Sequence, residues 1–120
     1  MDQPKSYFDI VLACDVLVYL GDLKSVLDSV HQVLKPGGVF AFSTELLQNN
    51  RENHDFVLHE CARFSHSSAY LERLAASGTS TFQLLRMVNR VLRKNRGDDV
   101  MGNLTILQKL GLTQEILSNV

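Results

Sequence analysis

Residues 7–23 read Tyr-Phe-Asp-Ile-Val-Leu-Ala-Cys-Asp-Val-Leu-Val-Tyr-Leu-Gly-Asp-Leu, and residues 39–45 read Val-Phe-Ala-Phe-Ser-Thr-Glu. The run Phe8–Leu12 is almost wholly apolar and rich in Ile and Val, which is typical of a strand buried on both faces, as parallel strands are. The second apolar run, Val39–Phe42, has the same character. The two runs therefore predict two strands of one sheet.

A helix is expected between these strands. Its apolar stripe recurs at helical spacing and consists of Leu23, Val26, Leu27, Val30, Val33 and Leu34. Asp22 stands at the expected N-cap, where a carboxylate accepts from free backbone N–H groups. The segment Pro36-Gly37-Gly38 is expected to end the helix, because proline cannot continue it and glycine tolerates a positive φ. Strand, helix and strand together predict a parallel pair with a right-handed crossover.

These residues resemble the middle of a class I S-adenosylmethionine-dependent methyltransferase of the type 11/12 kind. The resemblance is carried by Phe8-Asp9-Ile10-Val11, Asp15-Val16-Leu17, Gly21-Asp22-Leu23 and Val33-Leu34-Lys35-Pro36-Gly37-Gly38. Further along, Arg63-Phe64-Ser65-His66-Ser67 and Tyr70-Leu71 are similar to methyltransferase domains fused to tetratricopeptide repeats. The resemblance implies an α/β fold: the C-terminal half of a Rossmann-like sheet. It would hold strands in the order fourth, fifth, seventh and sixth, with the seventh antiparallel to its neighbours, and two helices.

The resemblance assigns residues 1–109 to a partial methyltransferase domain and leaves residues 110–120 as a tail outside the family fold. It also settles one ambiguity. Residues 82–94 have apolar positions closer to a helical stripe than to alternation, but the family has a long strand there. We follow the family, because Asn95-Arg96-Gly97-Asp98 is typical of a hairpin turn and residues 103–108 alternate as a strand does.

The family binds S-adenosylmethionine mainly through a glycine-rich loop and an acidic residue at the end of the second strand. No Gly-x-Gly occurs in the 120 residues. We therefore expect a methyltransferase domain that is incomplete in this chain. The alternative is a non-catalytic remnant, or an assembly or interaction module that does not bind the cofactor.

The resemblance implies roles for residues after the fourth strand. Ala13, Cys14 and Asp15 match positions that flank the methionine part of the cofactor. Many relatives carry a Glu-His pair where this chain has Val18-Tyr19, which removes the obvious general base. Tyr19 is left as the catalytic candidate, although a phenol of ordinary pKa, about 10, is a poor base at neutral pH. Asp15 as a strand-end residue and Tyr19 as a packing residue are the structural alternatives.

Two residues are expected on the substrate side. Glu45 ends the fifth strand, where ligands bind in open α/β sheets, and His66 belongs to the second matched motif. The alternative role of His66 is a hydrogen bond that positions the following helix, which Ser65 or Ser67 is expected to cap. Residues 46–62 are mostly polar around Phe56–Leu58 and are expected to form a loop, which either covers the methyl acceptor or is plain surface.

Composition excludes several classes of protein. With 45% hydrophobic and 21% charged residues the chain is that of an ordinary globular domain. A net charge of -1, with no nucleic-acid motif around the basic residues 86–96, indicates no nucleic-acid partner, and the apolar runs are too short for a membrane span. Cys14 and Cys61 make no disulfide framework, so cytoplasm is the default location. No metal site is expected, because the spacing of His54, His59, Cys61 and His66 matches no closed zinc site.

The expected fold also predicts partners. In the complete family fold the strand Phe8–Leu12 lies within the sheet, so in this chain one of its edges has no neighbour. Unprotected apolar edges template association. We expect pairing with a separately encoded N-terminal half or self-association through this first strand.

Overall fold

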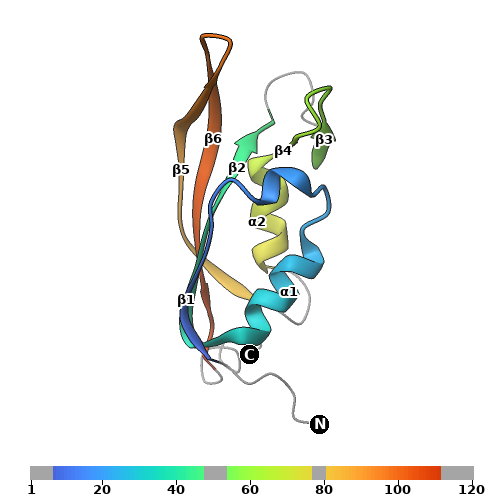
Figure 1. Cartoon of the computed structure of the whole chain (residues 1–120). Coiled ribbons are helices and arrows are strands. Elements are labelled where there is room, and N and C mark those ends of the chain that lie inside the picture. The colour runs from blue at the N-terminus through green and yellow to red at the C-terminus, as the bar shows by residue number, and fades with distance from the viewer. Residues whose placement is uncertain (1–6, 48–53, 77–80, 112–120) are drawn as a thin grey trace.

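The computed structural model describes residues 7–47, 54–76 and 81–111. One mixed sheet has both helices on the same face (Figure 1). The elements are β1 (Phe8–Ala13), the 3-10 helix η1 (Leu17–Tyr19), α1 (Lys24–Val33), β2 (Leu34–Leu46), β3 (Phe56–Leu58), β4 (Phe64–His66), α2 (Ser68–Ala76), β5 (Phe82–Asn95) and β6 (Asp98–Lys109). The tail beyond residue 111 lies outside the described residues.

The four long strands run in the order β1, β2, β6, β5. β1 is parallel to β2, with Val11 opposite Phe40. β6 is antiparallel to both β2 and β5. The predicted α/β fold, the order of its strands and the antiparallel position of the last strand are therefore confirmed.

The hairpin of β5 and β6 confirms the reading of residues 82–94 as a strand. Its turn contains Arg96 and Gly97 with φ of 53° and 86°, which is the pair of left-handed residues that a two-residue hairpin turn of type I′ requires. The alternation along β5 is interrupted by two register shifts, between Leu84 and Arg86 and between Val91 and Arg93, which explains why its apolar positions resemble a helical stripe. Such irregularities move successive side chains between faces and blur a strict alternation.

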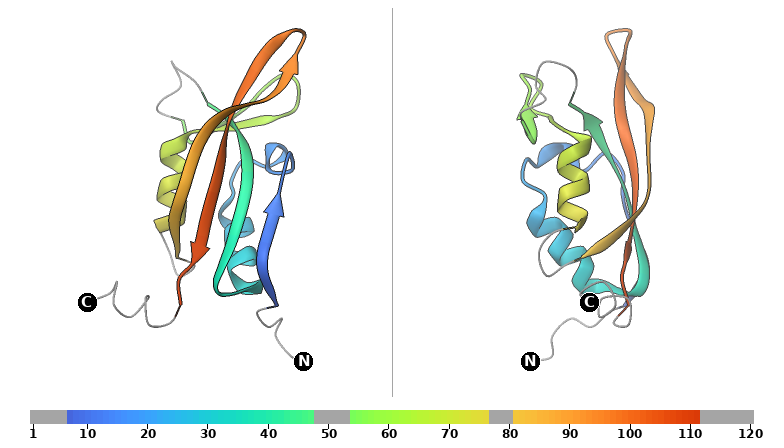
Figure 2. Two further views of the ribbon diagram at one scale, coloured as in Figure 1. Left: turned by 90° about the vertical axis from the view of Figure 1, so that its left-hand side faces the viewer. Right: turned by 180° about the vertical axis from the view of Figure 1, so that it is seen from behind.

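Residues 46–62 were expected to form a loop, and this was wrong in part. β3 pairs antiparallel with β4, and β4 pairs parallel with β2 at Glu45 and Leu46, beyond the point where β1 ends. The short apolar island of Phe56–Leu58 is a strand because it pairs with Phe64–His66. The β3–β4 hairpin therefore stands at the carboxyl end of β2 (Figure 2).

The helix boundaries are close to those expected. α1 begins with Leu23 at its N-cap rather than Asp22, although Asp22 Oδ1 accepts a hydrogen bond from the N–H of Lys24 at 2.9 Å. Ser67 Oγ accepts from the N–H of Tyr70 at 3.1 Å and so caps α2. The expected centre of the α1 stripe, Val30, is only partly buried, and Leu27 is the fully buried residue.

The core lies between the sheet and the two helices. Phe40 and Phe42 on β2, with Leu107 on β6, face α1 and α2 and are almost completely buried. Val11 and Ala13 of β1 pack against the same core. Burial of these side chains stabilises the fold through the hydrophobic effect.

The other face of the sheet carries no helix among the described residues (Figures 1 and 2). Ile10 and Leu12 alternate with the buried side of β1 and are 58% and 68% exposed. Leu104 of β6 lies on this face too, because it pairs with Ser43, and it is also exposed. The composition of β1 is typical of a strand buried on both faces, but among the described residues only one of its faces is covered by helices. We call the uncovered surface the open face.

Candidate functional site

The carboxyl ends of β1 and β2 meet at one edge of the sheet, because the two strands are parallel. Asp15 follows β1 and Glu45 lies near the end of β2. The N–H of Asp15 donates to Ser43 Oγ at 3.0 Å, which joins the turn after β1 to β2. Asp15 adopts a left-handed backbone with φ of 56°, a conformation that Asp tolerates better than most residues. Ala13 is partly buried, whereas Cys14 is exposed and has a free thiol.

Arg63 brings three of the predicted site residues together. Its Nη2 pairs with Asp15 Oδ1, and its Nε lies 2.6 Å from Glu45 Oε2. Nη1 lies 3.4 Å from the hydroxyl of Tyr19, and the guanidinium carbon is 5.6 Å from the centre of that ring. Asp15, Tyr19 and Glu45 come from three different segments, and this one side chain contacts all three.

Glu45 accepts from a second arginine. Arg93 of β5 lies 3.3 Å from Glu45 Oε2 through Nε and 3.4 Å from Oε1 through Nη2. The Glu45 side chain is 8% exposed and that of Arg63 is 14% exposed. Burial lowers the pKa of Arg63, but the hydrogen bonds and charges of Asp15 and Glu45 outweigh it and raise that pKa overall. The group formed by Asp15, Glu45, Arg63 and Arg93, here called the charged cluster, has two acids and two bases and is electrically balanced.

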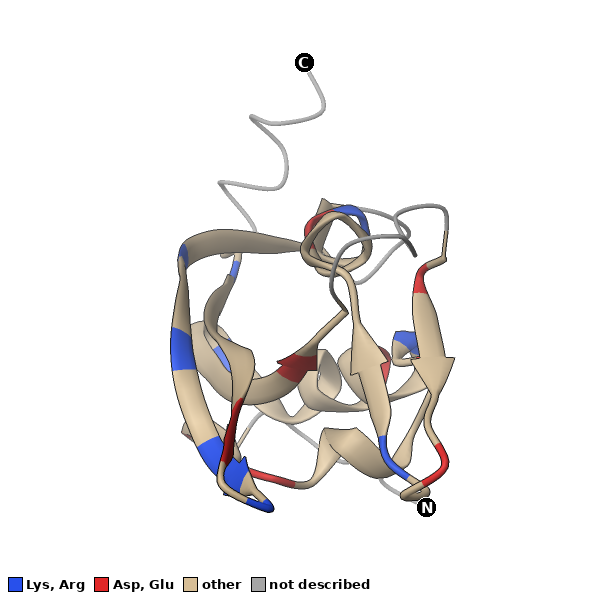
Figure 3. Cartoon of the chain, turned by 90° about the horizontal axis from the view of Figure 1, so that it is seen from above, with Lys and Arg blue, Asp and Glu red and all other residues tan. Residues whose placement is uncertain are grey.

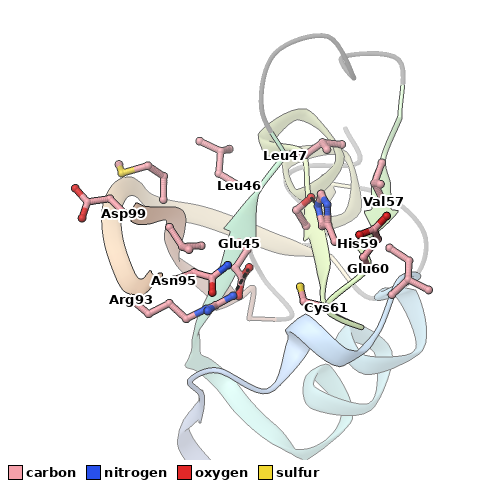
Figure 4. Close-up of a pocket in the computed structure, with 14 residues that line it drawn as sticks. Glu45, Leu46, Leu47, Val57, His59, Glu60, Cys61, Arg93, Asn95 and Asp99 are labelled. Carbon is pink, nitrogen blue, oxygen red and sulfur yellow. Dashed lines mark hydrogen bonds and ion pairs between the residues drawn. The ribbon is translucent and has the colours of Figure 1, made fainter. Parts of the chain in front are cut away.

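A pocket of about 690 Å³ opens beside the charged cluster (Figure 4). Seen from the carboxyl end of β2, the β5–β6 hairpin stands on one side and β3–β4 on the other (Figure 3). The volume of the pocket is in the range of sites for small molecules. The lining consists of Glu45, Leu46, Leu47, Val57, Leu58, His59, Glu60, Cys61, Ser65, Arg93, Asn95, Asp99, Val100 and Met101. Much of it comes from residues 46–62, the stretch expected near the methyl acceptor.

One polar pair within this pocket was not predicted. His59 Nε2 lies 2.6 Å from Ser65 Oγ, and both residues belong to the β3–β4 hairpin or its turn. Glu45 is the register partner of Ser65 on β2. The pocket therefore presents an imidazole, a hydroxyl and a charge-balanced carboxylate to a bound molecule, next to apolar side chains from both hairpins.

His66 lies in the core rather than on the pocket wall. The ring is fully buried, its Nε2 lies 3.0 Å from the carbonyl oxygen of Gly21, and it stacks on Tyr70. Burial lowers the pKa of His66, so the ring is neutral near pH 7, with the Nε2 hydrogen donated to Gly21. Tyr70 in turn accepts from the N–H of Leu23 at 2.9 Å. Both rings fix the segment between η1 and α1, so the hydrogen bond of His66 goes to that segment and not to α2, the helix that was expected to be positioned by it.

Sequence reasoning missed the two arginines of the charged cluster. Arg63 belongs to a motif matched for other reasons, and Arg93 belongs to the basic residues 86–96, to which no role at the site was assigned. The exposed placement holds for Arg86 and Arg90, and Lys94 pairs with Asp99 at 2.8 Å. A usable signal was Glu45 at the end of an apolar strand, since a buried carboxylate requires a basic partner.

Two other features follow from the described residues. No group of three or more His, Cys, Asp or Glu side chains in the described ranges is arranged to hold a metal ion. Nor is any helix within those ranges long and apolar enough to cross a membrane.

Comparison with known proteins identifies the fold. A family model described as "Methyltransferase domain" matches residues 1–40. An S-adenosylmethionine-dependent methyltransferase from Methanosarcina mazei superposes with a TM-score of 0.65 at 21% identity, over 88% of this chain and 61% of that one. No curated protein matches the sequence significantly.

Two further structures of similar fold are proteins with different named activities. The 1,6-didemethyltoxoflavin N1-methyltransferase of Burkholderia thailandensis, bound to 1,6-didemethyltoxoflavin and S-adenosylhomocysteine, superposes with a TM-score of 0.67 at 16% identity, over 92% of this chain and 47% of that one. The [4+2]-cyclase SpnF superposes with a TM-score of 0.64 at 15% identity, over 92% and 53%. The chain thus has the α/β fold of S-adenosylmethionine-dependent methyltransferases and spans about half to two thirds of these structures.

Proposed function

We propose that the chain is part of an S-adenosylmethionine-dependent methyltransferase and supplies the side of the site formed by the fourth and fifth strands of that fold. The observation that carries the proposal is the meeting of the carboxyl ends of β1 and β2 beside a pocket of small-molecule size. Open α/β sheets bind their ligands at such ends. The matching family model and the methyltransferases among the structural neighbours support the same function.

The cofactor would lie against the turn of Ala13, Cys14 and Asp15. The Asp15 carboxylate is engaged by Arg63, so the turn would contact the cofactor chiefly through its backbone. When bound, S-adenosylmethionine supplies a methyl group on a sulfonium, and the protein has to align the acceptor with it and exclude water. The fit is partial, since the sequence has no Gly-x-Gly loop.

The methyl acceptor would occupy the pocket. Glu45 lines it, which supports a place for this residue on the substrate side, and two arginines already balance its charge. His66 would act through the loop that it holds, and not by contact with the acceptor. Tyr19 remains the candidate catalytic residue; its ring is 59% exposed and its hydroxyl faces Arg63.

The remaining part of the site would come from a partner. Within the described residues β1 pairs only with β2, so its second edge is unpaired. Ile10 and Leu12 expose large apolar side chains on the open face. We propose that a separately encoded N-terminal half of the fold docks on this edge and face. A second copy of the chain is the alternative occupant.

The exposed surface also supports a second function. Phe8, Ile10 and Leu12 form an apolar row on an edge strand, and such rows associate whether or not a cofactor binds. An assembly module, or a remnant that no longer binds S-adenosylmethionine, would have the same surface. SpnF shows that the fold serves a protein named for a reaction other than methyl transfer.

Cofactor binding separates the two functions. The chain is purified alone and after co-expression with an N-terminal segment of the Methanosarcina mazei protein, of which this chain spans 61%. Calorimetry with S-adenosylmethionine is expected to give a dissociation constant above about 1 mM for the chain alone. The complex is expected to bind in the micromolar range.

The controls concern the docking surface. The double variant Ile10→Lys, Leu12→Lys is expected to abolish the complex, whereas Arg86→Ala on β5 is expected to leave it intact. Micromolar binding by the monomeric chain would contradict the proposed incompleteness. A stable complex that does not bind the cofactor would favour the assembly module.

A further inference from the structure

The side chain of Arg63 has three partners in three separate segments, and none of these partners is on its own hairpin. It pairs with Asp15 after β1, with Glu45 at the end of β2, and with the ring and hydroxyl of Tyr19 in η1. A guanidinium is a rigid planar fork, so it holds several acceptors in one fixed arrangement, which a lysine ammonium cannot do. The guanidinium therefore links the turn after β1 to the end of β2, and we call this link the clamp.

Asp15 is the partner whose backbone needs support. Its φ of 56° lies in the left-handed region, which costs energy for a residue other than glycine unless its surroundings hold it. Its N–H is held by Ser43 at 3.0 Å and its carboxylate is held by Arg63. Ser43 and Glu45 both lie on β2, so both ends of the residue are tied to one rigid strand.

We propose that Arg63 is a positioning residue, which fixes the turn Ala13–Asp15 and the η1 segment and so presents their backbone to the methyl donor. This inference rests on the proposed function for the role of the turn. Asp15 would then act as an anchor for Arg63 and not as a direct ligand of the cofactor. The proposal explains why a residue from the β3–β4 hairpin lies at the end of β1, although neither strand of that hairpin pairs with β1.

Hydrogen exchange of the Asp15 amide tests the clamp without any cofactor. In Arg63→Gln that amide is expected to exchange at least about tenfold faster. Exchange requires the turn to open, and in this variant opening no longer has to break the contacts of Arg63. Amides of the β6 strand near Leu107, in the core, are expected to exchange as before. The matched control is Arg73→Gln, which removes an exposed pair with Asp55 and leaves the turn untouched.

Arg63→Lys keeps the charge but not the fork, and is the variant to use if Arg63→Gln does not fold. We expect it to loosen the Asp15 amide too, by at least about threefold. An unchanged Asp15 amide in folded Arg63→Gln, or in Arg63→Lys if only that variant folds, would overturn the clamp. Faster exchange throughout β6 as well as at Asp15 would also overturn it, because the residue would then act on global stability alone.

Cofactor affinity tests the role of the clamp. In the complex with the N-terminal segment, Arg63→Gln is expected to weaken S-adenosylmethionine binding at least about tenfold, while Arg73→Gln leaves it unchanged. A loosened turn with unchanged affinity would overturn the positioning role. Failure of the unsubstituted complex to bind the cofactor would count against the proposed function, and the exchange result would still stand for the clamp.

Discussion

Both faces of the sheet carry apolar side chains, but within the described ranges helices cover only one of them. On the covered face, Phe40, Phe42 and Leu107 are buried beneath α1 and α2. On the open face, Ile10 and Leu12 are largely exposed although they lie on the same sheet, one or two strands away. The difference shows that the apolar composition of a strand reflects how deeply its fold buries it. In the described part of this chain, β1 is buried on one face only.

The polar side chains also differ between the core and the strand ends. Those in the core near α2 are neutral: His66, Tyr70, Ser67 and Asn103. At the strand ends, paired acids and arginines form the charged cluster. A partner that docks on the open face would reduce the solvent exposure of both β1 and this cluster, and thereby strengthen the ion pairs.

The largest expected effect breaks the covered face. Phe40→Ala should destabilise the chain by about 3–5 kcal/mol, because it leaves a cavity where a fully buried ring contacts Phe42. Chemical denaturation followed by circular dichroism measures the change. A loss below about 1 kcal/mol would mean that the two faces do not differ in the way described.

A smaller effect is expected in the charged cluster. Glu45→Gln leaves Arg63 and Arg93 without their shared carboxylate, and should cost about 1.5–3 kcal/mol, the range of a hydrogen bond to a charged group. Solvent screens Arg93, which is the more exposed of the two, so the lower part of the range applies. The matched control is Asp99→Asn, which removes an exposed pair with Lys94 and should cost under about 0.5 kcal/mol. Equal losses in the two variants would remove the distinction between cluster and surface.

Protonation of His66 provides a pH-dependent test of the covered face. Burial lowers its pKa in the folded chain below the ordinary value of about 6.5. Above that value the ring is neutral in both states, and stability does not depend on it. As the pH falls below about 6.5, the unfolded chain takes up the proton first, so stability is lost with a slope approaching about 1.4 kcal/mol per pH unit.

Denaturation between pH 5 and 7 measures that slope. His66→Asn should remove it, whereas His54→Asn, at an exposed position, should leave it in place. An identical slope in both variants would show that another group titrates.

Much of the fold was predictable because its signals are local. The apolar runs of β1 and β2, the stripe of α1 and the turn at Arg96 and Gly97 each indicate one element. The pairing of β3 with β4 was not predictable, since strands of three residues have no periodicity to read. The identity of β5 as a strand came from the family resemblance, because two register shifts disguise its alternation.

The site was predictable only at the ends of strands. Asp15 and Glu45 follow apolar runs, and the parallel sheet then brings them to one edge. Arg63 lies 48 residues from Asp15, and no local pattern announces that contact. His66 was assigned to the substrate side through its motif, whereas the fold places it in the core, where desolvation and not ligand contact governs its pKa.

The smallest expected effect on stability lies on the open face. Leu12→Thr keeps a side chain that suits a strand and replaces one that is 68% exposed. It should therefore change the stability of the monomeric chain by less than about 0.5 kcal/mol, like other surface substitutions. Its effect on association should be larger, because less apolar surface is available to a partner on the open face. Denaturation of the dilute chain gives the first quantity, and light scattering over a range of concentrations gives the second. If Leu12→Thr costs several kcal/mol in the dilute chain, β1 is already covered there by a second copy or by residues outside the described ranges. Unchanged association would place the contact elsewhere than on β1.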